Sequence, residues 1–233
     1  MSASAAIRPT TDEDIDRLRI RDVVEAWVIL RDSGDWERFA TLWTDDGWMT
    51  ATWFQGTAPD FIEQSRRGAE AGVRIAHVLG AHTAELAGDR AIAQTRMEIH
   101  QRGELHGEVV DVTCYGRFYD FFDARSGRWA IRRRQPIYEW DELRPVDPAV
   151  RLDLDHAELE RLPDGYRFLA YLQERTGEQV RLDLPGRAGP QLESLYAEGR
   201  AWLGGAASPW TDDDASTWLD PGTSSPHGSA TAS

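Results

Sequence analysis

Apolar residues near the N-terminus recur every three or four positions, which is the period of an amphipathic helix packed on a core. The stripe consists of Ile20, Val23, Val24, Trp27 and Val28. The helix is expected to begin after Thr11, whose hydroxyl can cap an acidic first turn, and to end near Ser33 and Gly34. By helical phase, Arg31 lies near the centre of the apolar face, and Asp32 lies at its edge.

A second helix and a first strand are predicted next. Asp35 can cap this helix, which carries an apolar stripe of Trp36, Phe39, Leu42 and Trp43. The segment Asp45-Asp46-Gly47 is typical of a turn, and alternating apolar positions then predict a strand over 48–54. Residues 59–72 return to a helical pattern, so a third helix is expected there.

The pattern changes to that of strands after residue 77. Alternating and continuous apolar runs predict four strands, over 77–87, 90–101, 108–123 and 128–140, with glycine-containing turns between them. Helices followed by a meander of antiparallel strands give an α+β order, which differs from the alternating order of nucleotide-binding folds. We therefore expect one α+β domain over residues 11–148.

The composition changes again after residue 148. Residues 149–205 carry scattered apolar anchors such as Tyr166, Leu172 and Trp202, too few for a core of their own. We expect a helical extension that packs on the main domain and could reach the mouth of a cavity. Residues 1–10 and 206–233 are mostly small and polar, which predicts a frayed start and a disordered tail.

Charge and composition exclude several classes of function. The net charge of −14 repels phosphate backbones and anionic lipid, so neither nucleic acid nor a membrane is an expected partner. All 26 basic residues are arginine, so this chain cannot form a lysine Schiff base or present a P-loop lysine. No apolar run reaches the ~20 residues of a membrane span, and the first ten residues do not resemble a signal peptide. A cytoplasmic location is therefore expected.

Cysteine and histidine do not form a metal-binding pattern. Cys114 is the one cysteine, and His82, His100 and His106 have spacings that match no strong metal signature. His82 follows His77 by five residues, so a regular strand would put these two side chains on opposite faces. We expect no metal and no cofactor.

Short motifs follow one another over residues 12–142 in an order that is informative. They are the segments 20–22, 32–36 and 42–46, then His77 ahead of the segment 88–91, and finally the segments 116–120 and 127–131. In order and spacing these motifs resemble the SnoaL-like branch of the nuclear transport factor 2-like superfamily, which includes scytalone dehydratase and hexachlorocyclohexane dehydrochlorinase. The resemblance implies a curved, mostly antiparallel sheet that forms a cone with the N-terminal helices, a cystatin-like α+β barrel, with a single enclosed pocket. Because the family hosts both enzymes and non-catalytic binders, fold transfers better than function.

The resemblance also puts three side chains at the positions of catalytic groups in the lyase members. Asp32 falls where their first-helix aspartate lies, His77 falls at their catalytic histidine, and Arg134 falls at an arginine of the dehydrochlorinases. An imidazole can take a proton from carbon, a carboxylate on its other nitrogen fixes the tautomer, and an arginine can bind a departing anion. The residues alone leave other interpretations open, namely a solvent-exposed helix end for Asp32, a half-buried strand residue for His77 and a charged sheet face for Arg134.

Aromatic residues are candidates for the wall of the pocket. Trp27, Trp48 and Trp53 either shape the pocket or fill the core, and Tyr115 and Tyr119 either offer a hydroxyl to a substrate or pack in the core. Alternation puts both tyrosines on the same sheet face as Asp111.

These features combine into one hypothesis, a cofactor-independent lyase of the dehydratase or dehydrohalogenase type, or an isomerase. It would act on a small hydrophobic, cyclic substrate by His/Asp general-base chemistry. A non-catalytic ligand-binding module and a structural subunit resembling the small β subunit of ring-hydroxylating dioxygenases are the alternatives. Contact between His77 and Asp32 at an enclosed cavity would favour the enzyme. Because sheets of this family commonly pair through their outer faces, a homo-oligomer is expected, either a dimer or a trimer.

Overall fold

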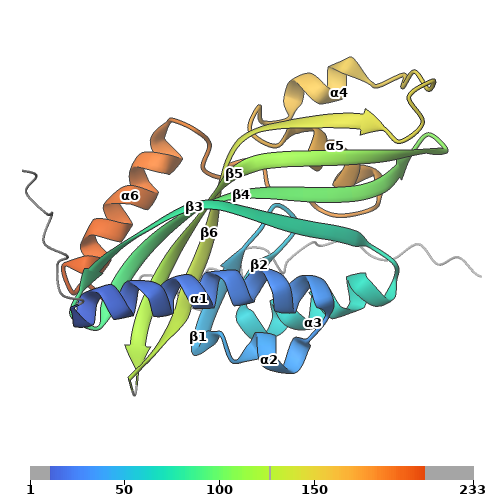
Figure 1. The fold of residues 1–233 in the computed structure, drawn as a ribbon. Helices are drawn as coiled ribbons and strands as arrows, with labels where there is room; N and C mark the ends of the chain where they lie inside the picture. The colour runs from blue at the N-terminus through green and yellow to red at the C-terminus, as the bar shows by residue number, and fades with distance from the viewer. Residues whose placement is uncertain (1–10, 126, 208–233) are drawn as a thin grey trace, which may run out of the picture.

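A curved, open sheet of six strands forms the centre of the computed structural model, which describes residues 11–125 and 127–207 (Figure 1). The strand order is β2-β1-β6-β5-β4-β3, and neighbouring strands are antiparallel except β1 and β6, which are parallel. The predicted α+β class with a curved, mostly antiparallel sheet is therefore confirmed. The predictions for residues 1–10, and those for 208–233 within the expected tail, lie outside the described residues.

Helix α1 (Asp12–Ser33) begins and ends where the sequence predicts. The Thr11 hydroxyl accepts a hydrogen bond from the backbone N–H of Asp14, and the Asp14 carboxylate accepts one from the backbone of Thr11, which completes a capping box. Gly34 ends the helix with φ 75°, a left-handed conformation that glycine adopts without strain. The buried stripe of α1, centred on Trp27, packs against β3 (Arg74–Ala87) and β6 (Arg128–Pro145).

The boundary between the second helix and the first strand differs from the prediction. Helix α2 (Trp36–Ala40) is short, and β1 (Trp43–Thr50) already starts at Trp43, which pairs with Ile131 of β6. The expected turn at Asp45-Asp46-Gly47 is instead an irregularity inside β1, because the register with β6 shifts between Trp43 and Trp48. The next elements are β2 (Gln55–Thr57) and α3 (Ala58–Glu70).

Two details of the long strands differ from the sequence pattern. First, β4 (Arg90–Leu105) and β5 (Glu108–Arg125) meet at a two-residue turn in which His106 and Gly107 have φ of 54° and 84°, so β4 continues to Leu105 instead of ending near residue 101. Second, β3 has a bulge between Leu79, which pairs with Met97, and His82, which pairs with Thr95. This bulge reverses the alternation, so His82 lies on the same sheet face as His77 and not on the opposite one.

The C-terminal helices cover both faces of the sheet. Helices α4 (His156–Arg161) and α5 (Arg167–Arg175) join the core that α1 and α3 form on one face, here called the inner face. Helix α6 (Pro190–Leu203) packs on the opposite, outer face (Figure 1). There Leu195 and Trp202 belong to one buried cluster with Tyr119 and Phe121. None of the helices in the described ranges is long and apolar enough to cross a membrane.

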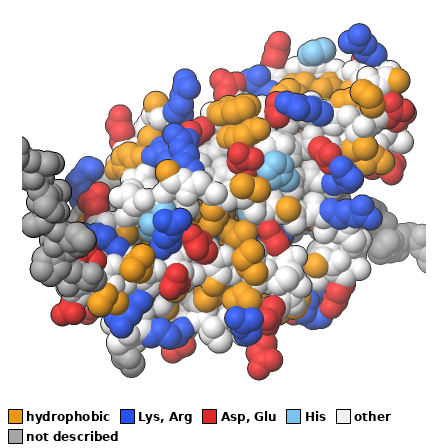
Figure 2. Space-filling view, in the orientation of Figure 1, with side chains coloured by type: hydrophobic (Ala, Val, Ile, Leu, Met, Phe, Trp, Pro, Cys, Tyr) orange, Lys and Arg blue, Asp and Glu red, His pale blue; other side chains and the backbone are white. Residues whose placement is uncertain are grey.

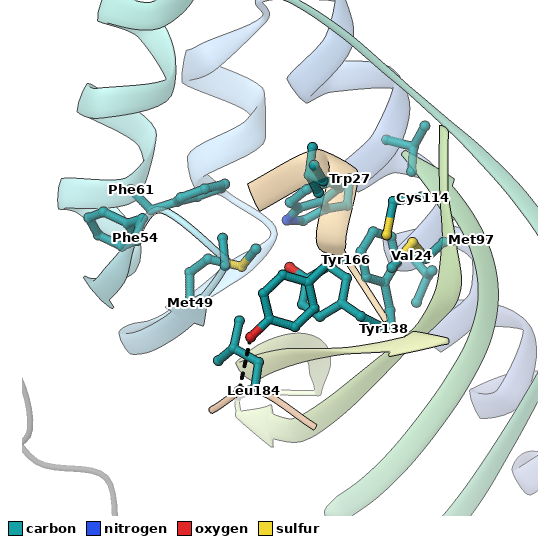
Figure 3. Packing of buried hydrophobic residues seen from close by; sticks show 14 of the residues in the cluster. Val24, Trp27, Met49, Phe54, Phe61, Met97, Cys114, Tyr138, Tyr166 and Leu184 are labelled. Carbon is teal, nitrogen blue, oxygen red and sulfur yellow. Dashed lines mark hydrogen bonds between the residues drawn. The ribbon is translucent and has the colours of Figure 1, made fainter. Parts of the chain in front are cut away.

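Aromatic side chains dominate the inner core. Figure 3 shows Trp27, Met49 and Phe61 from the N-terminal half near Tyr138 of β6 and Tyr166, which precedes α5. The Tyr166 hydroxyl is held by the backbone N–H of Leu184 at 3.3 Å. The extension is therefore part of the same core as the helices at the N-terminus.

Candidate functional site

The structure brings Asp32 of α1 and His77 of β3 into direct contact. Asp32 Oδ1 lies 2.8 Å from His77 Nδ1, and Asp32 Oδ2 accepts a 2.7 Å hydrogen bond from the backbone N–H of His77. Because the carboxylate can only accept, Nδ1 carries the ring proton and Nε2 carries the lone pair. Among the described residues, Nε2 has no hydrogen-bond partner.

Burial keeps this imidazole neutral. Burial lowers the pKa of His77; the hydrogen bond and charge of Asp32 oppose this only in part, and the charges of Arg31 and Arg134 lower the pKa further. For Asp32, burial acts to raise the pKa, but the bonds from His77 and the charge of Arg31 outweigh it and hold the pKa below its ordinary value. The pair therefore consists of a neutral base and an ionised partner near neutral pH.

Arg134 lies beside the same aromatic rings as His77. The His77 ring meets Trp27 edge-on at 5.3 Å and lies 6.1 Å from the ring of Phe118. The Arg134 guanidinium stacks over these two rings, at 4.3 Å and 3.9 Å. Arg134 already has an ionic partner that holds two sides of its guanidinium, since its Nε and Nη2 donate to Asp120 at 2.7 Å each.

The sequence predicts a single enclosed pocket, but several hollows adjoin Asp32 and His77 in the described part of the chain, and two of them share a wall. An inner cavity of about 40 Å³ is lined by His77, Trp27 and Phe61 among others. An outer pocket of about 690 Å³ opens to the surface and is lined by Trp36, Ser65 and residues of α3. Five residues line both hollows and form the boundary between them: Arg31, Trp53, Ile75, Gln101 and Gln173.

The predicted wall residues separate into two groups. Trp27 and Trp53 line the inner cavity as expected. Trp48 is buried in β1 between Thr57 and Arg133 and lines neither hollow.

The assignment of Tyr115 and Tyr119 to the pocket is wrong. Tyr115 stacks on Trp140 with ring centroids 3.8 Å apart, and Tyr119 packs against Tyr196 of α6, so both lie on the outer face. Cys114 and Phe118 occupy the inner positions of β5, and strand alternation then turns both tyrosines away from the cavity.

Several polar residues of the site were not among those predicted from the sequence. Thr52 donates to Gln173 at 2.6 Å and Gln173 donates to Gln101 at 3.1 Å, so a chain of buried polar groups crosses the cavity wall. Gln173 belongs to α5, and nothing in its local pattern connects it with His77. The sequence did contain a sign that Arg31 belongs to the site, because its helical phase puts this charged residue near the centre of an apolar face.

Comparisons with known proteins agree with this architecture. Residues 13–135 match the SnoaL-like domain. A PEP2-like protein of Fusarium vanettenii is 35% identical over 216 residues, which cover 87% of this chain and 92% of the relative. Pea pathogenicity protein 2 of the same fungus is 33% identical over 215 residues, with coverage of 87% and 92%.

Solved structures are similar to this chain at low sequence identity. A protein of Kribbella flavida has a TM-score of 0.50 at 13% identity, covering 56% of this chain and 95% of its own. A hexachlorocyclohexane dehydrochlorinase has a TM-score of 0.49 at 13% identity, covering 62% and 97%. Likeness at this level concerns the fold and leaves the chemistry to the side chains described above.

Proposed function

This chain belongs to the SnoaL-like domain family, and from that premise we propose that it is a cofactor-independent lyase or isomerase acting on a small hydrophobic, cyclic substrate. One observation carries the proposal, the 2.8 Å contact between His77 Nδ1 and Asp32 Oδ1 beside an inner cavity that His77 lines. A base needs a free lone pair and a fixed tautomer, and this contact supplies both.

In the proposed reaction, His77 Nε2 takes a proton from a carbon of the substrate. The electrons of that C–H bond form a new double bond, and in an elimination the group on the neighbouring carbon leaves with its bonding pair. In an isomerisation, His77 returns the proton to a different carbon. Asp32 stabilises the imidazolium that forms in either case, because its carboxylate stays on Nδ1.

Arg134 supports the same chemistry. It shares the rings of Trp27 and Phe118 with His77, and its Nη1 is buried without a hydrogen-bond partner among the described residues. Arg134 lines neither hollow, because the rings of Trp27 and Phe118 lie on its side toward His77. Its charge therefore favours a developing negative charge in the cavity through these rings and not by a direct hydrogen bond, while Asp120 neutralises part of the guanidinium.

A screen of small hydroxylated and halogenated rings tests the proposal, with loss of water or hydrogen halide, or a shifted double bond, followed by mass spectrometry and NMR. For any compound that turns over, His77→Ala is expected to lower the rate by about 10²–10⁴-fold. Asp32→Asn is expected to lower kcat more than it raises KM, because it changes the tautomer and leaves the substrate contacts in place. Equal turnover by wild type and His77→Ala would disprove the assignment.

A further inference from the structure

Arg31 lies beside the Asp32–His77 pair, and one edge of its guanidinium makes no hydrogen bond within the described residues. Its side chain is only 11% exposed, and its one hydrogen bond within the described part of the chain runs from Nη1 to Asp32 Oδ1 at 3.3 Å. Nε is buried without a partner, and no described residue accepts from Nη2. These two N–H groups form the side of the guanidinium that pairs with a planar carboxylate through two parallel hydrogen bonds.

Asp32 cannot satisfy this arginine, because its carboxylate already serves His77. Oδ1 bonds His77 Nδ1 at 2.8 Å, Oδ2 bonds the His77 backbone at 2.7 Å, and Arg31 makes the longer bond of 3.3 Å to the shared Oδ1. Burial lowers the pKa of Arg31, and Asp32 offsets this only in part. A buried cation with unmet donors is costly to fold around unless a ligand pairs with it.

A second unmet group lies in the same pocket. Ser65 Oγ on α3 is buried and has no hydrogen-bond partner among the described residues, and Ser65 and Arg31 both line the outer pocket. From these groups we infer that the outer pocket binds a carboxylate on the Nε–Nη2 edge of Arg31, so that the substrate is a small carboxylic acid with an apolar, ring-sized body. This inference names the substrate class and rests on the proposed function.

The shape of the two hollows supports the same class of ligand. The outer pocket of about 690 Å³ has the size typical of small-molecule sites, and Trp36, Trp53 and Val73 give it apolar walls. The inner cavity of about 40 Å³ has room for little more than one water-sized group. Arg31 bonds the same oxygen of Asp32 as His77 and lines both hollows, so a carboxylate on Arg31 lies at the boundary between the outer pocket and the cavity that His77 lines.

Two other charged residues of the outer pocket, Arg67 and Glu178, provide control variants for the carboxylate site. Arg67 also lines the outer pocket, but it is exposed and bonded to Glu63 at 2.8 Å. Glu178 lines the pocket as an acid whose pKa is raised by burial. A bound carboxylate would be repelled by Glu178 when that group is ionised, so Glu178→Gln is expected to tighten binding.

Calorimetric titration of the full chain with benzoate and benzamide tests the inference, because the two probes have the same shape and differ in charge. Wild type is expected to bind benzoate more tightly than benzamide by about tenfold or more. Arg31→Gln is expected to remove this preference, and Arg67→Gln is expected to keep it. Equal affinity of wild type for the two probes, or no heat from benzoate at millimolar concentration, would overturn the inference even if no Arg31 variant folds.

The outcome is separable from that of the proposed function. Benzoate selectivity that depends on Arg31, without turnover of any ring in the screen, acidic or neutral, would sustain the carboxylate site and count against the lyase. Turnover of neutral rings that requires His77, without a benzoate preference, would sustain the lyase and refute the carboxylate site. An unchanged benzoate affinity in folded Arg31→Gln likewise refutes the carboxylate site.

Discussion

Asp120 and Arg134 face each other across β5 and β6 and form a two-bond ion pair in which both side chains are 0% exposed. Trp27 and Phe118 close the pair off on the side of His77. A charge pair this deep is costly to desolvate, and it is tolerated only while both partners are present.

Removing one partner should therefore be severe. Asp120→Asn is expected to lower the free energy of unfolding by about 3–5 kcal/mol, because Arg134 would remain as an uncompensated buried cation. Urea unfolding followed by circular dichroism measures this loss. Arg102 and Asp111 make an equivalent two-bond pair across β4 and β5, but both side chains are 44% exposed. Asp111→Asn is therefore the matched control, and a loss as large as that of Asp120→Asn would show that burial is not the cause.

The protonation state of His77 can be measured without a substrate. Nitrogen-detected NMR is expected to find the Nδ1–H tautomer at neutral pH and a pKa below the ordinary 6.5, chiefly because the ring is buried. Asp32→Asn should lower that pKa further, since it removes the carboxylate that stabilises the imidazolium. A His77 pKa above 6.5 would contradict the buried, neutral base.

The same shift has a consequence for stability. Because the pKa of folded His77 lies below its unfolded value of 6.5, the unfolded chain binds this proton first as the pH falls. The contribution of neutral, buried His77 to the free energy of unfolding is therefore complete above about pH 6.5 and is lost as the pH falls through the pKa of folded His77. His77→Gln should make unfolding less sensitive to pH in that window.

The parts of the site that depend on local sequence pattern could be predicted from the sequence. The cap at Thr11 fixes the start of α1, and the resemblance puts Asp32 and His77 at positions that the fold brings together. Alternation assigned Tyr115 and Tyr119 to one face but could not say that this is the outer face, where α6 covers Tyr119. The bulge before His82 and the arrival of Gln173 from α5 depend on pairing and packing between distant segments, which no local period encodes.

Asp141 is expected to make stability depend on pH in the opposite direction from His77. Its carboxylate accepts a 2.8 Å bond from the backbone of Leu169 in the first turn of α5. Burial raises its pKa from 3.8 to about 6, although those backbone bonds resist the shift. The folded chain therefore holds an extra proton between these values, and this stabilising contribution is lost as the pH rises from about 4 to 6.

Asp141→Asn keeps an acceptor for the backbone and removes the ionisation. Relative to wild type, the variant is expected to gain about 1–3 kcal/mol between pH 4 and pH 7 in urea unfolding. Asp111→Asn should show no such gain, because the hydrogen bonds from Arg102 hold the pKa of Asp111 low. A gain of the same size in both variants would point to general charge repulsion.

Two helix glycines should respond to alanine with opposite signs. A Cβ at Gly199 of α6 would lie 2.0 Å from the Tyr119 hydroxyl, whereas a Cβ at Gly68 of α3 would meet only Val73 at 3.9 Å. Gly199→Ala is expected to cost about 1–3 kcal/mol and Gly68→Ala to add about 0.4–1 kcal/mol, measured by chemical unfolding. Tyr119→Phe should recover part of the first loss, and no recovery would argue against the clash.

Assembly into a dimer or trimer remains a prediction. On the outer face beyond α6, Trp140 is 48% exposed and stacks on Tyr115, and Val78 is 50% exposed. Light scattering at micromolar concentration is expected to give a dimer or trimer, and Trp140→Arg should favour the monomer. Leu18→Arg, on the exposed side of α1, is the control that should leave the assembly intact. A wild-type monomer would refute the prediction.

Helix α5 separates two properties that could change independently over evolution. Asp32 and His77 come from α1 and β3, while Leu169 and Gln173 of the cavity wall come from a segment beyond residue 135, where the family match ends. Substitutions in α5 can therefore alter the cavity wall while the Asp32–His77 contact, which we propose transfers the proton, stays fixed. A protein trimmed to the matched region would lose that wall, so its ligand preferences would be a poor guide to those of the chain described here.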